Sequence, residues 1–471
     1  MSARRKIEEA LILMIRFKSF VIGLLLVLIF VFISIYAMVT LPYDQAIRMW
    51  NSIEYWQDYP KLAFPEWINA FSSKKLPVGT MIFDSREPKL GITKSRQTIA
   101  IGGGGMIATI KFSFEYEYDD FPSEIVMWFF INTTQPMLVK VTWIKPDGSQ
   151  FIVYRNVLEK YQYYRVSGDL ELMNRYKFYI IKKLRANITY DITPEIALFA
   201  KEDASILSKD TVTPLKGRYR VVIEASSADP NADIDVKLNI YGKVYGLLGT
   251  DDKRRDLWIG IMWGAPLALS FGVLASVLTA FLQMIIAATA AWYGGIVDHL
   301  ISRINEIVMV IPFLPLLIMI SYFYKFSIWT LLIVVVALSA FGGGIKTYRA
   351  MFLQVKEMPY IEAARAYGAS NARIILRYMV PRVLPTIIPA IVLSVPSFVF
   401  LEAALAILGV GDPQAITWGK ILDEAYTGGA LYWGLYHWIL APSVCLMTIS
   451  IGFALMGFTL DRIFNPRLRE R

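Results

Sequence analysis

The sequence predicts an α-helical polytopic membrane protein with six spanning helices and a β-rich domain inserted after the first of them. Hydrophobic residues make up 55% of the 471-residue chain, charged residues only 18%, and the mean hydropathy is +0.45. Such a composition is too apolar for an ordinary globular chain. Uncharged runs of about 20 residues, the length needed to cross a bilayer, recur along the sequence. Between residues 44 and 247 they give way to alternating, more polar sequence, which is typical of a water-soluble β domain.

The composition also excludes several kinds of site. The single cysteine, Cys445, rules out an internal disulfide framework and a cysteine-based zinc site. His299 and His437 lie far apart in the sequence and offer no metal-ligand spacing. The formal charge of +9 would suit nucleic acid, but basic residues of a membrane protein collect on cytoplasmic loops. We therefore predict no catalytic residues, no metal or cofactor site and no nucleic-acid partner for this chain.

The first apolar run, from Ser19 to Tyr43, carries no charge. It is too long and too evenly apolar for a signal peptide, so we expect a retained membrane anchor. The uncharged stretch from Leu257 to Val297 is too long for one straight crossing, and Pro266 predicts an interfacial segment that precedes a span. The five spans after the anchor are expected at 267–292, 307–324, 327–345, 383–408 and 438–460.

Basic residues set the predicted orientation. One cluster lies between the fourth and fifth candidate spans and another closes the chain: Arg349, Lys356, Arg365, Arg373, Arg377 and Arg382, then Arg462, Arg467, Arg469 and Arg471. Because positive residues favour the cytoplasmic side, both regions and the basic N-terminus are expected in the cytoplasm. Six crossings satisfy these placements together. The protein is thus expected to be a multi-pass cell-membrane protein whose insert at 44–247 is extracytoplasmic.

The insert is predicted to be rich in strands. Alternating runs at 109–118 and 137–155 read as strands, and Pro146-Asp147-Gly148 within the second is a hairpin-turn signal. The runs at 217–225 and 233–241 resemble the closing strands of an immunoglobulin-like sandwich, although short strands at such spacing also fit other β folds. Two glycosylation sequons, at Asn132 and Asn187, suit an outside location.

Two glycine runs look faintly like phosphate-binding loops. The run Gly102 to Gly105 lacks a following Lys-Ser/Thr, so a turn or loop is the better interpretation. The run Gly342 to Gly344 has the wrong spacing and lies at the end of a spanning helix rather than between a strand and a helix. The sequence therefore predicts no nucleotide site.

The cytoplasmic stretch PYIEAARAYGASNARIILRYMVPRVLP (359–385) predicts a helix, a turn and a second helix. Pro359 suits a first helical turn, and Glu362 near that end complements the helix dipole. Gly368 is the expected stop of the first helix, and Ser370 or Asn371 can cap the second. The small side chains of Ala363, Ala364 and Ala366 leave a surface that another protein can approach closely, and Arg373 shares a face with Arg377.

This loop resembles the EAA loop of ABC-importer permeases, whose pattern is EAA, three residues, Gly, nine residues, then Ile-x-Leu-Pro. Glu362, Ala363, Ala364 and Gly368 match in register, and Pro381 falls at the expected distance. Tyr378 and Val380 replace the isoleucine and leucine. The resemblance implies that residues 355–382 couple the permease to an ATPase through Glu362, Ala363, Ala364, Ala366, Gly368, Arg373 and Pro381.

Other segments resemble the dipeptide, oligopeptide and nickel class of these importers, and within it the second permease. LGTDDKRRDL (248–257) is similar to that class's GTDxxGRD entry to the second span, with Arg254 where glycine is usual. EAALAILGVG (402–411) followed by Trp418-Gly419 resembles its EAxLSFLGLG…WG stretch, and FNPRLRER (464–471) resembles its ending. The insert at 44–247 has no counterpart in the pattern.

The resemblance implies a type I importer permease fold and a transport subunit that is not an enzyme. Its partners would be a related second permease, two ABC ATPase subunits that bind ATP and Mg²⁺, and an extracytoplasmic substrate-binding protein. Peptides are the expected substrate, with oligosaccharides or nickel as alternatives. The implied domains are 1–43 (N-terminus and first span), 44–247 (insert) and 248–471 (permease core with five spans).

Acids inside spanning segments are functional candidates by default. Glu306 and Glu402 lie at or near span ends, so either a role in translocation or a local, interfacial placement explains them. Pro396, with Pro385 and Pro389, predicts a kinked or broken fifth span that lines a pathway or shapes packing.

Two functions of other classes compete with the importer. An ion-driven secondary transporter needs internal repeats and paired mid-membrane charges, and the sequence shows neither. A membrane-anchored receptor would explain the insert but gives the EAA-like loop no purpose.

Overall fold

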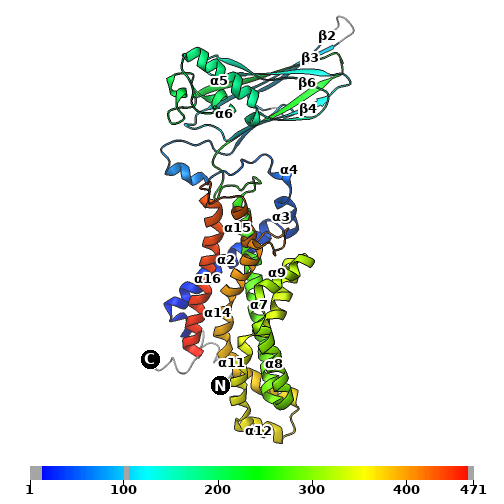
Figure 1. Cartoon of the computed structure of the whole chain (residues 1–471), viewed down its shortest axis with the longest axis vertical. Coiled ribbons are helices and arrows are strands. Elements are labelled where there is room, and N and C mark those ends of the chain that lie inside the picture. The colour runs from blue at the N-terminus through cyan, green and yellow to red at the C-terminus, as the bar shows by residue number, and fades with distance from the viewer. Residues whose placement is uncertain (1–12, 88, 100–104, 465–471) are drawn as a thin grey trace. The chain divides into compact units, whose positions relative to one another are not determined.

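The computed structural model describes residues 13–87, 89–99 and 105–464. The chain forms two compact units (Figure 1). We call Ser52–Trp258 the β unit, and Met1–Asn51 together with Ile259–Arg471 the helical unit. The insert predicted at 44–247 corresponds to the β unit, whose bounds lie somewhat later in the sequence, since the short helix α3 (Tyr43–Trp50) groups with the helical unit. The basic N-terminus and the FNPRLRER ending, apart from Phe464, lie outside the described residues.

Within the described residues, the helical unit has four helices long and apolar enough to cross a membrane, or six spans if each of two bent pairs is one span. The four are α2 (Lys18–Thr40), α7 (Leu257–Tyr293), α14 (Val380–Ile407) and α16 (Tyr436–Phe464). The pairs are α8 (Gly295–Val310) with α9 (Phe313–Phe323), bent by 80°, and α10 (Ile328–Ser339) with α11 (Gly343–Lys356), bent by 54°. A shorter helix, α15 (Trp418–Thr427), precedes α16. The predicted helical membrane fold is confirmed at this level.

Three details of the predicted spans were wrong. There is no separate interfacial segment before the second span, because α7 runs without a break through Pro266. The third span is bent: Ile311 is extended, as expected for a residue that precedes proline, and α9 starts after Pro312. The fourth span is also bent, between α10 and α11, where Gly342 precedes α11. Long apolar runs indicate that spans exist, but they do not locate bends.

The prolines were expected to kink or break the fifth span, and the structure shows no break. Helix α14 continues past Pro385, Pro389 and Pro396. It is preceded without a gap by a π-helical turn at Ile374–Met379, so that one helical stretch extends from Asn371 to Ile407. Neighbouring helices and local π geometry can accommodate the backbone groups that proline frees.

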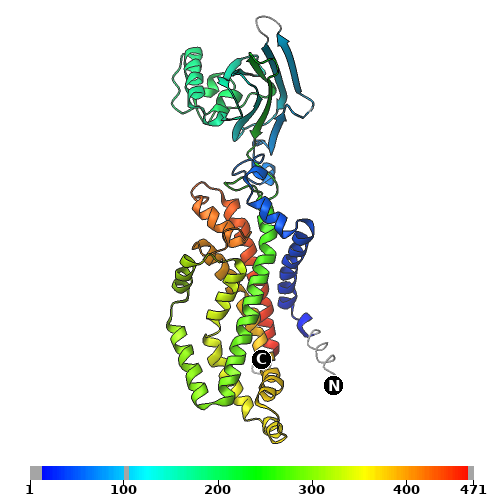
Figure 2. The same cartoon turned by 90° about the vertical axis from the view of Figure 1, so that its right-hand side faces the viewer.

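Glycines allow the helices to approach one another closely. A Cβ on Gly264 would lie 2.1 Å from the Trp418 ring, and one on Gly272 would lie 2.4 Å from Val399. A Cβ on Gly23 of α2 would likewise lie too close to the backbone of α16. These two helices lie side by side (Figure 2). Small residues at helix contacts are typical of membrane bundles, where packing rather than water drives association.

The β unit contains two antiparallel sheets. One has the strand order β1-β9-β4-β7 and the other β2-β3-β8-β5-β6. The strands are β1 (Thr80–Asp84), β2 (Ile92–Ile99), β3 (Gly105–Tyr116), β4 (Glu124–Asn132), β5 (Met137–Ile144), β6 (Gln150–Leu158), β7 (Gln162–Arg165), β8 (Gly217–Ser227) and β9 (Asp233–Tyr241). Buried residues of both sheets, such as Phe112, Trp143 and Phe129, belong to one hydrophobic core. The insert is therefore β-rich, as predicted.

The predicted strand runs are all found as strands. In the β5–β6 hairpin, Gly148 has a φ of 84° and donates its N–H to the carbonyl of Lys145 (3.0 Å), as the Pro-Asp-Gly signal indicates. Strands β8 and β9 are consecutive but belong to different sheets. Of the Gly102–Gly105 loop, only Gly105 is described, and it begins β3.

The helices of the β unit were not predicted from the sequence. They are α4 (Ile53–Trp56), α5 (Leu170–Leu184) and α6 (Pro194–Phe199), together with 3₁₀ turns at Glu66–Ala70, Val166–Gly168 and Ala204–Leu207. Helix α5 buries Leu172, Tyr176 and Ile180, spaced by four residues, against the sheet core. Its cap is Asp169, which accepts the N–H of Leu172 (2.9 Å). That spacing and cap were the signals available in the sequence.

An ion pair lies in the core of the β unit. The Lys145 ammonium is fully buried and donates to the Glu202 carboxylate (3.1 Å), the Tyr176 hydroxyl (3.1 Å) and the Ala200 carbonyl (3.0 Å). Burial lowers the pKa of Lys145, and its attraction to Glu202 offsets only part of this effect. Burial would raise the pKa of Glu202, but the ammonium groups of Lys145 and Lys183 outweigh it and lower that pKa. Each of these two buried charges therefore stabilises the ionised form of the other.

A Glu202→Gln variant should destabilise the β unit by about 3 kcal/mol, because the buried Lys145 ammonium loses its counter-charge. The matched control is Glu224→Gln, which removes the half-exposed pair between Lys140 and Glu224 (3.0 Å) and should cost less than about 1 kcal/mol. Pulse proteolysis of the purified full chain in increasing urea measures both. Equal shifts for the two variants would contradict the role assigned to the buried pair.

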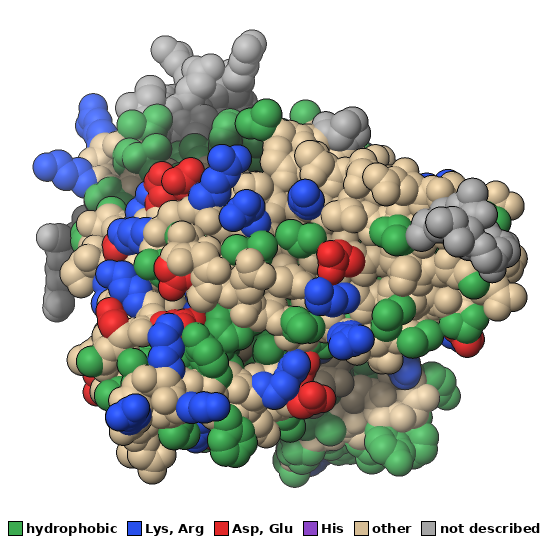
Figure 3. All heavy atoms as spheres, turned by 90° about the horizontal axis from the view of Figure 1, so that it is seen from above, with side chains coloured by type: hydrophobic (Ala, Val, Ile, Leu, Met, Phe, Trp, Pro, Cys, Tyr) green, Lys and Arg blue, Asp and Glu red, His purple; other side chains and the backbone are tan. Residues whose placement is uncertain are grey.

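The surface of the β unit mixes charges of both signs. In the face seen in Figure 3, blue and red side chains lie next to one another rather than in a wide field of one sign. Exposed pairs such as Lys94 with Asp233 (3.0 Å) are part of this pattern. A mixed charged surface is typical of a water-soluble domain.

Candidate functional site

The loop between the fourth and fifth spans begins with helix α12 (Pro359–Ala366). Pro359 occupies the first helical turn and Glu362 lies in that turn, as the sequence predicts. The helix ends in a Schellman motif. The N–H of Ala369 donates to the carbonyl of Ala364 (3.1 Å), and the N–H of Gly368 donates to the carbonyl of Arg365 (3.0 Å). Gly368 has a φ of 76°, so the predicted glycine stop is confirmed.

One face of α12 is exposed and the other is buried. Glu362, Ala363 and Ala366 are exposed, and the Tyr367 ring that follows them is 92% exposed. Ala364, by contrast, is buried together with Ile361. The EAA-like segment thus exposes two of its three small side chains, Ala363 and Ala366. Ala364 lets the helix pack closely on its own unit.

The buried face of α12 packs on other helices of the helical unit. Ile361 belongs to one hydrophobic cluster with Trp292 at the end of α7 and Phe352 of α11. The Lys356 ammonium donates to the carbonyls of Ala291 (3.0 Å) and Trp292 (2.9 Å), which are terminal carbonyls of α7. The buried face of α12 and the ends of α7 and α11 therefore share one hydrophobic cluster.

The second half of the loop starts at Ser370, whose hydroxyl accepts the N–H of Arg373 (3.4 Å) and so caps the following helix, as predicted. Arg373 and Arg377 are both exposed. Pro381 lies in the first turn of α14, within the continuous stretch from Asn371 to Ile407.

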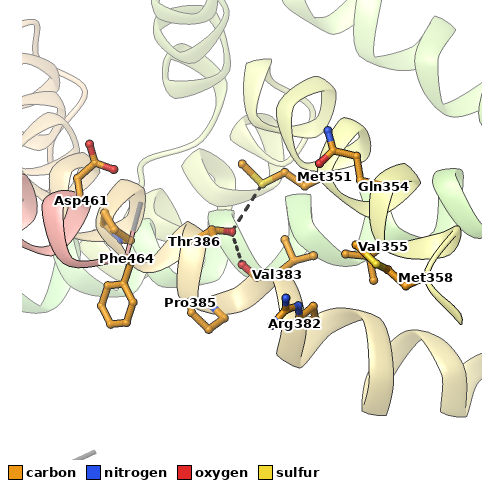
Figure 4. A pocket seen from close by; sticks show the side chains of 11 residues that line it. Met351, Gln354, Val355, Met358, Arg382, Val383, Pro385, Thr386, Asp461 and Phe464 are labelled. Atoms are coloured by element: carbon orange, nitrogen blue, oxygen red, sulfur yellow. Dashed lines mark hydrogen bonds between the residues drawn. The ribbon is translucent and has the colours of Figure 1, made fainter. Parts of the chain in front are cut away.

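A cavity of about 640 Å³ lies beside the loop (Figure 4). Its lining comes from the ends of α11, α14 and α16 and includes Met358 at the start of the loop. Four polar side chains, Gln354, Arg382, Thr386 and Asp461, line it together with apolar groups. Helix ends next to α12 thus border a cavity instead of packing tightly against one another.

The two acids expected near span ends lie in different surroundings. Glu306 is exposed and pairs with Arg303 (2.9 Å) one turn earlier on α8. Glu402 is only 5% exposed, in α14, where the Thr417 side chain hydrogen-bonds it. Pro396 lies in the same helix, half-buried. The structure does not bring Glu306, Glu402 and Pro396 into one cluster.

The segment after Glu402 forms a compact corner. Helix α14 ends in a second Schellman motif, in which Val410 donates to the carbonyl of Leu405 (2.8 Å) and Gly409 has a φ of 77°. The Trp418 indole donates to the Ile261 carbonyl of α7 (3.0 Å). The glycines and tryptophan of the LGVG…WG pattern thus join α14, α15 and α7.

The segment LGTDDKRRDL forms a tight buried turn before α7. Asp251 and Arg255 pair at 2.6 Å, and both are almost fully buried. Arg254 has a left-handed φ of 67°, at the position where the resembling pattern has glycine. Its guanidinium contacts the Glu124 carboxylate, donates to the Tyr59 carbonyl (2.8 Å) and lies 4.3 Å from the centre of the Tyr241 ring. These contacts offset the strain of a left-handed arginine, about 1–2 kcal/mol.

Residues 283–470 match the family described as the binding-protein-dependent transport system inner membrane component. This range includes α12, Glu306 and Glu402. A putative peptide transport system permease protein of Brucella suis is 31% identical over 225 residues, which cover 47% of this chain and 74% of the relative. The oligopeptide transport system permease protein OppC of Bacillus subtilis is 27% identical over 224 residues, 47% of this chain and 72% of OppC.

The dipeptide transport system permease protein DppC of Alkalihalophilus pseudofirmus is 30% identical over 226 residues, which cover 47% of this chain and 72% of that protein. A solved inward-facing structure of the MetNI methionine ABC transporter aligns with a TM-score of 0.30 at 21% identity, over 43% of this chain and 96% of that chain.

Proposed function

Because the chain belongs to the family of binding-protein-dependent transport system inner membrane components, we propose that it forms half of the pathway through which an ATP-driven importer carries peptides. Peptides are supported as the substrate class by the relatives, which are peptide, oligopeptide and dipeptide permeases. The other half of the pathway is a related second permease. Two ABC ATPase subunits bind ATP and Mg²⁺, and an extracytoplasmic binding protein delivers the substrate. The chain itself carries out no hydrolysis.

The observation that carries this proposal is the exposed face of α12. Glu362, Ala363 and Ala366 present a small, capped helical surface that fits a groove of an ATPase subunit. Closure of the ATPase dimer on ATP displaces α12 as a rigid body. Since Ile361 packs against Trp292, the ends of the spans follow and access alternates between the two sides.

The proposed orientation places both termini and α12 in the cytoplasm. With six crossings, α12 and the α7–α8 turn lie on the same side, and the packing of Ile361 on Trp292 supports this. The start of α10 and the segment after α14 then share the outer side, which agrees with the hydrogen bond from the Ile328 N–H to Asp412 (3.1 Å). The β unit is then extracytoplasmic. Its two antiparallel sheets with one core support an immunoglobulin-like sandwich.

The test uses the chain reconstituted in lipid with its ATPase and permease partners. Ala363→Trp should abolish substrate-stimulated ATP hydrolysis, because a large ring on the exposed face blocks close approach of the ATPase. Glu362→Lys should reduce it too, since it sets a positive charge against the positive helix N-terminus. Ala204→Trp, at an exposed alanine of the β unit, is the control and should leave coupling intact.

Failure of the wild-type chain to co-purify with an ATPase would overturn the proposed function. Unchanged substrate-stimulated hydrolysis in both α12 variants would show instead that this face is not the docking surface.

A further inference from the structure

A cavity of about 470 Å³ lies in the β unit, and the proposed coupling mechanism does not use it. It lies at the end of β7, the edge strand of the four-stranded sheet, and is lined by residues of β4, β7, β9 and the turn before α7. Its volume falls within the range of small-ligand pockets, about 300–1,000 Å³. Every lining residue belongs to the β unit, so the cavity is a feature of that unit alone.

The charged lining of this cavity is mainly basic. Its cations are Lys61, Arg165, Lys253 and Arg254, and its acids are Glu124 and Asp252. The buried Glu124 carboxylate is already shared between two arginines, since it accepts from Arg165 Nε (2.6 Å) and also contacts Arg254. A further carboxylate in the cavity would therefore meet uncompensated positive charge.

Arg165 has the geometry to bind such a group. Its side chain is 57% exposed, and only its Nε is engaged, so the terminal N–H groups of its guanidinium have no partner among the described residues. An arginine fork of this kind binds a carboxylate through two parallel hydrogen bonds. The exposed Lys61 ammonium, also without a partner in the described part of the chain, lines the same cavity.

Aromatic rings form the neighbouring wall. Trp128 and Tyr163 lie across the β4–β7 pair with ring centres 5.8 Å apart. Trp128 is nearly buried, whereas Tyr163 is 46% exposed, so an apolar group can lie against it. A ligand that fits this cavity thus carries a carboxylate next to an apolar or aromatic side chain.

We propose that this cavity binds the C-terminal residue of a peptide, with the α-carboxylate on Arg165 and Lys61 and the side chain against Tyr163. The choice of a peptide rests on the proposed function, whereas the carboxylate-and-apolar chemistry comes from the cavity itself. The site would capture peptide on the inserted unit, separately from any binding protein.

The test measures equilibrium binding of a labelled tripeptide that ends in phenylalanine to the purified full chain in lipid nanodiscs, without ATPase or binding protein. The free acid should bind, and its C-terminal amide should bind at least about 10-fold more weakly, because the charge-assisted hydrogen bonds are lost. Arg165→Gln should remove most of the difference between the free acid and the amide, with Lys61 keeping the remainder, and leave binding of the amide unchanged. Arg165→Lys, which keeps the charge but not the fork, should be intermediate.

Two controls separate binding from folding. Lys140→Gln, on the five-stranded sheet, removes a surface cation outside the cavity and should bind the free acid like the wild type. The Arg165→Gln variant should keep its urea resistance, since Glu124 retains Arg254. Equal binding of acid and amide, unchanged binding in Arg165→Gln, or no binding of the free acid would each overturn the proposal. Binding by a chain that associates with no ATPase would overturn the importer function and leave this site standing.

Discussion

A Gly368→Val variant should lose most substrate uptake, at least about fivefold, while the complex still assembles. The Schellman turn requires a φ of 76° at this position, and valine enters the left-handed region at a cost of about 1–2 kcal/mol. A Cβ at Gly368 would meet nothing within 4 Å, so the expected defect is backbone strain rather than a clash. A strain of this size shifts the population of the correct turn by about 5- to 30-fold. The exposed face of α12 is then presented at the wrong angle.

The measurement is uptake of labelled peptide by proteoliposomes that contain the full complex. Gly343→Val is the matched control, because Gly343 also has open space around its Cβ but lacks a positive φ. Gly368→Asn should restore much of the uptake, since asparagine tolerates the left-handed region better than other residues. Full uptake by Gly368→Val would contradict the assignment of this turn as the coupling element.

The structure of the EAA-like loop could be predicted in detail because its signals are local. Pro359, Gly368 and Ser370 each act on the backbone within a few residues of themselves, and the structure has each where its chemistry requires. The predicted strands share this advantage, because alternation and the Pro-Asp-Gly turn are read within one hairpin. Family resemblance then added a role that no single residue reveals.

What could not be predicted depends on contacts between distant segments. Ile361 of α12 shares a hydrophobic cluster with Trp292 of α7 and Phe352 of α11, and no local pattern encodes that packing. Likewise, α14 passes through three prolines because its surroundings tolerate the lost hydrogen bonds. The left-handed Arg254 is held by Glu124, 130 residues away in the sequence. Glu402 was recognisable as an unusual charge, but its proximity to Thr417 was not.

Removal of most of the β unit should leave a complex that inserts and hydrolyses ATP but takes up little substrate at low concentration. The structure indicates where to cut. The Phe64 N–H donates to the Lys243 carbonyl (2.8 Å) and the Glu66 N–H to the Gly246 carbonyl (2.9 Å), so the two chain segments are adjacent there. A short Gly/Ser linker in place of residues 67–242 can therefore close the gap without strain.

This cut keeps the main contacts within the turn before α7 and removes those of Arg254 with Glu124 and Tyr241. Thr250 still bonds Pro60 and Ala63, and Asp251 still pairs with Arg255, because both contacts lie outside the excised range. A folding failure of the helical unit is thus not expected, since membrane-spanning helices satisfy their own backbone hydrogen bonds. Any loss of uptake can then be assigned to the excised part of the β unit.

The uptake curve distinguishes three roles for the inserted domain. If it docks the binding protein or captures peptide, the excised chain should need much more substrate for half-maximal uptake, and its maximal rate should be largely preserved. If it covers the entrance, basal ATP hydrolysis without substrate should rise as well. A spacer that only lifts the docking site through a thick cell envelope predicts normal affinity in proteoliposomes, where no envelope is present. Normal uptake at low peptide concentration would therefore eliminate docking and capture.

The Arg165→Gln variant of the intact chain tests the carboxylate site in the same assay. If it reproduces part of the increase in half-saturating peptide concentration, that part of the increase is due to the carboxylate site.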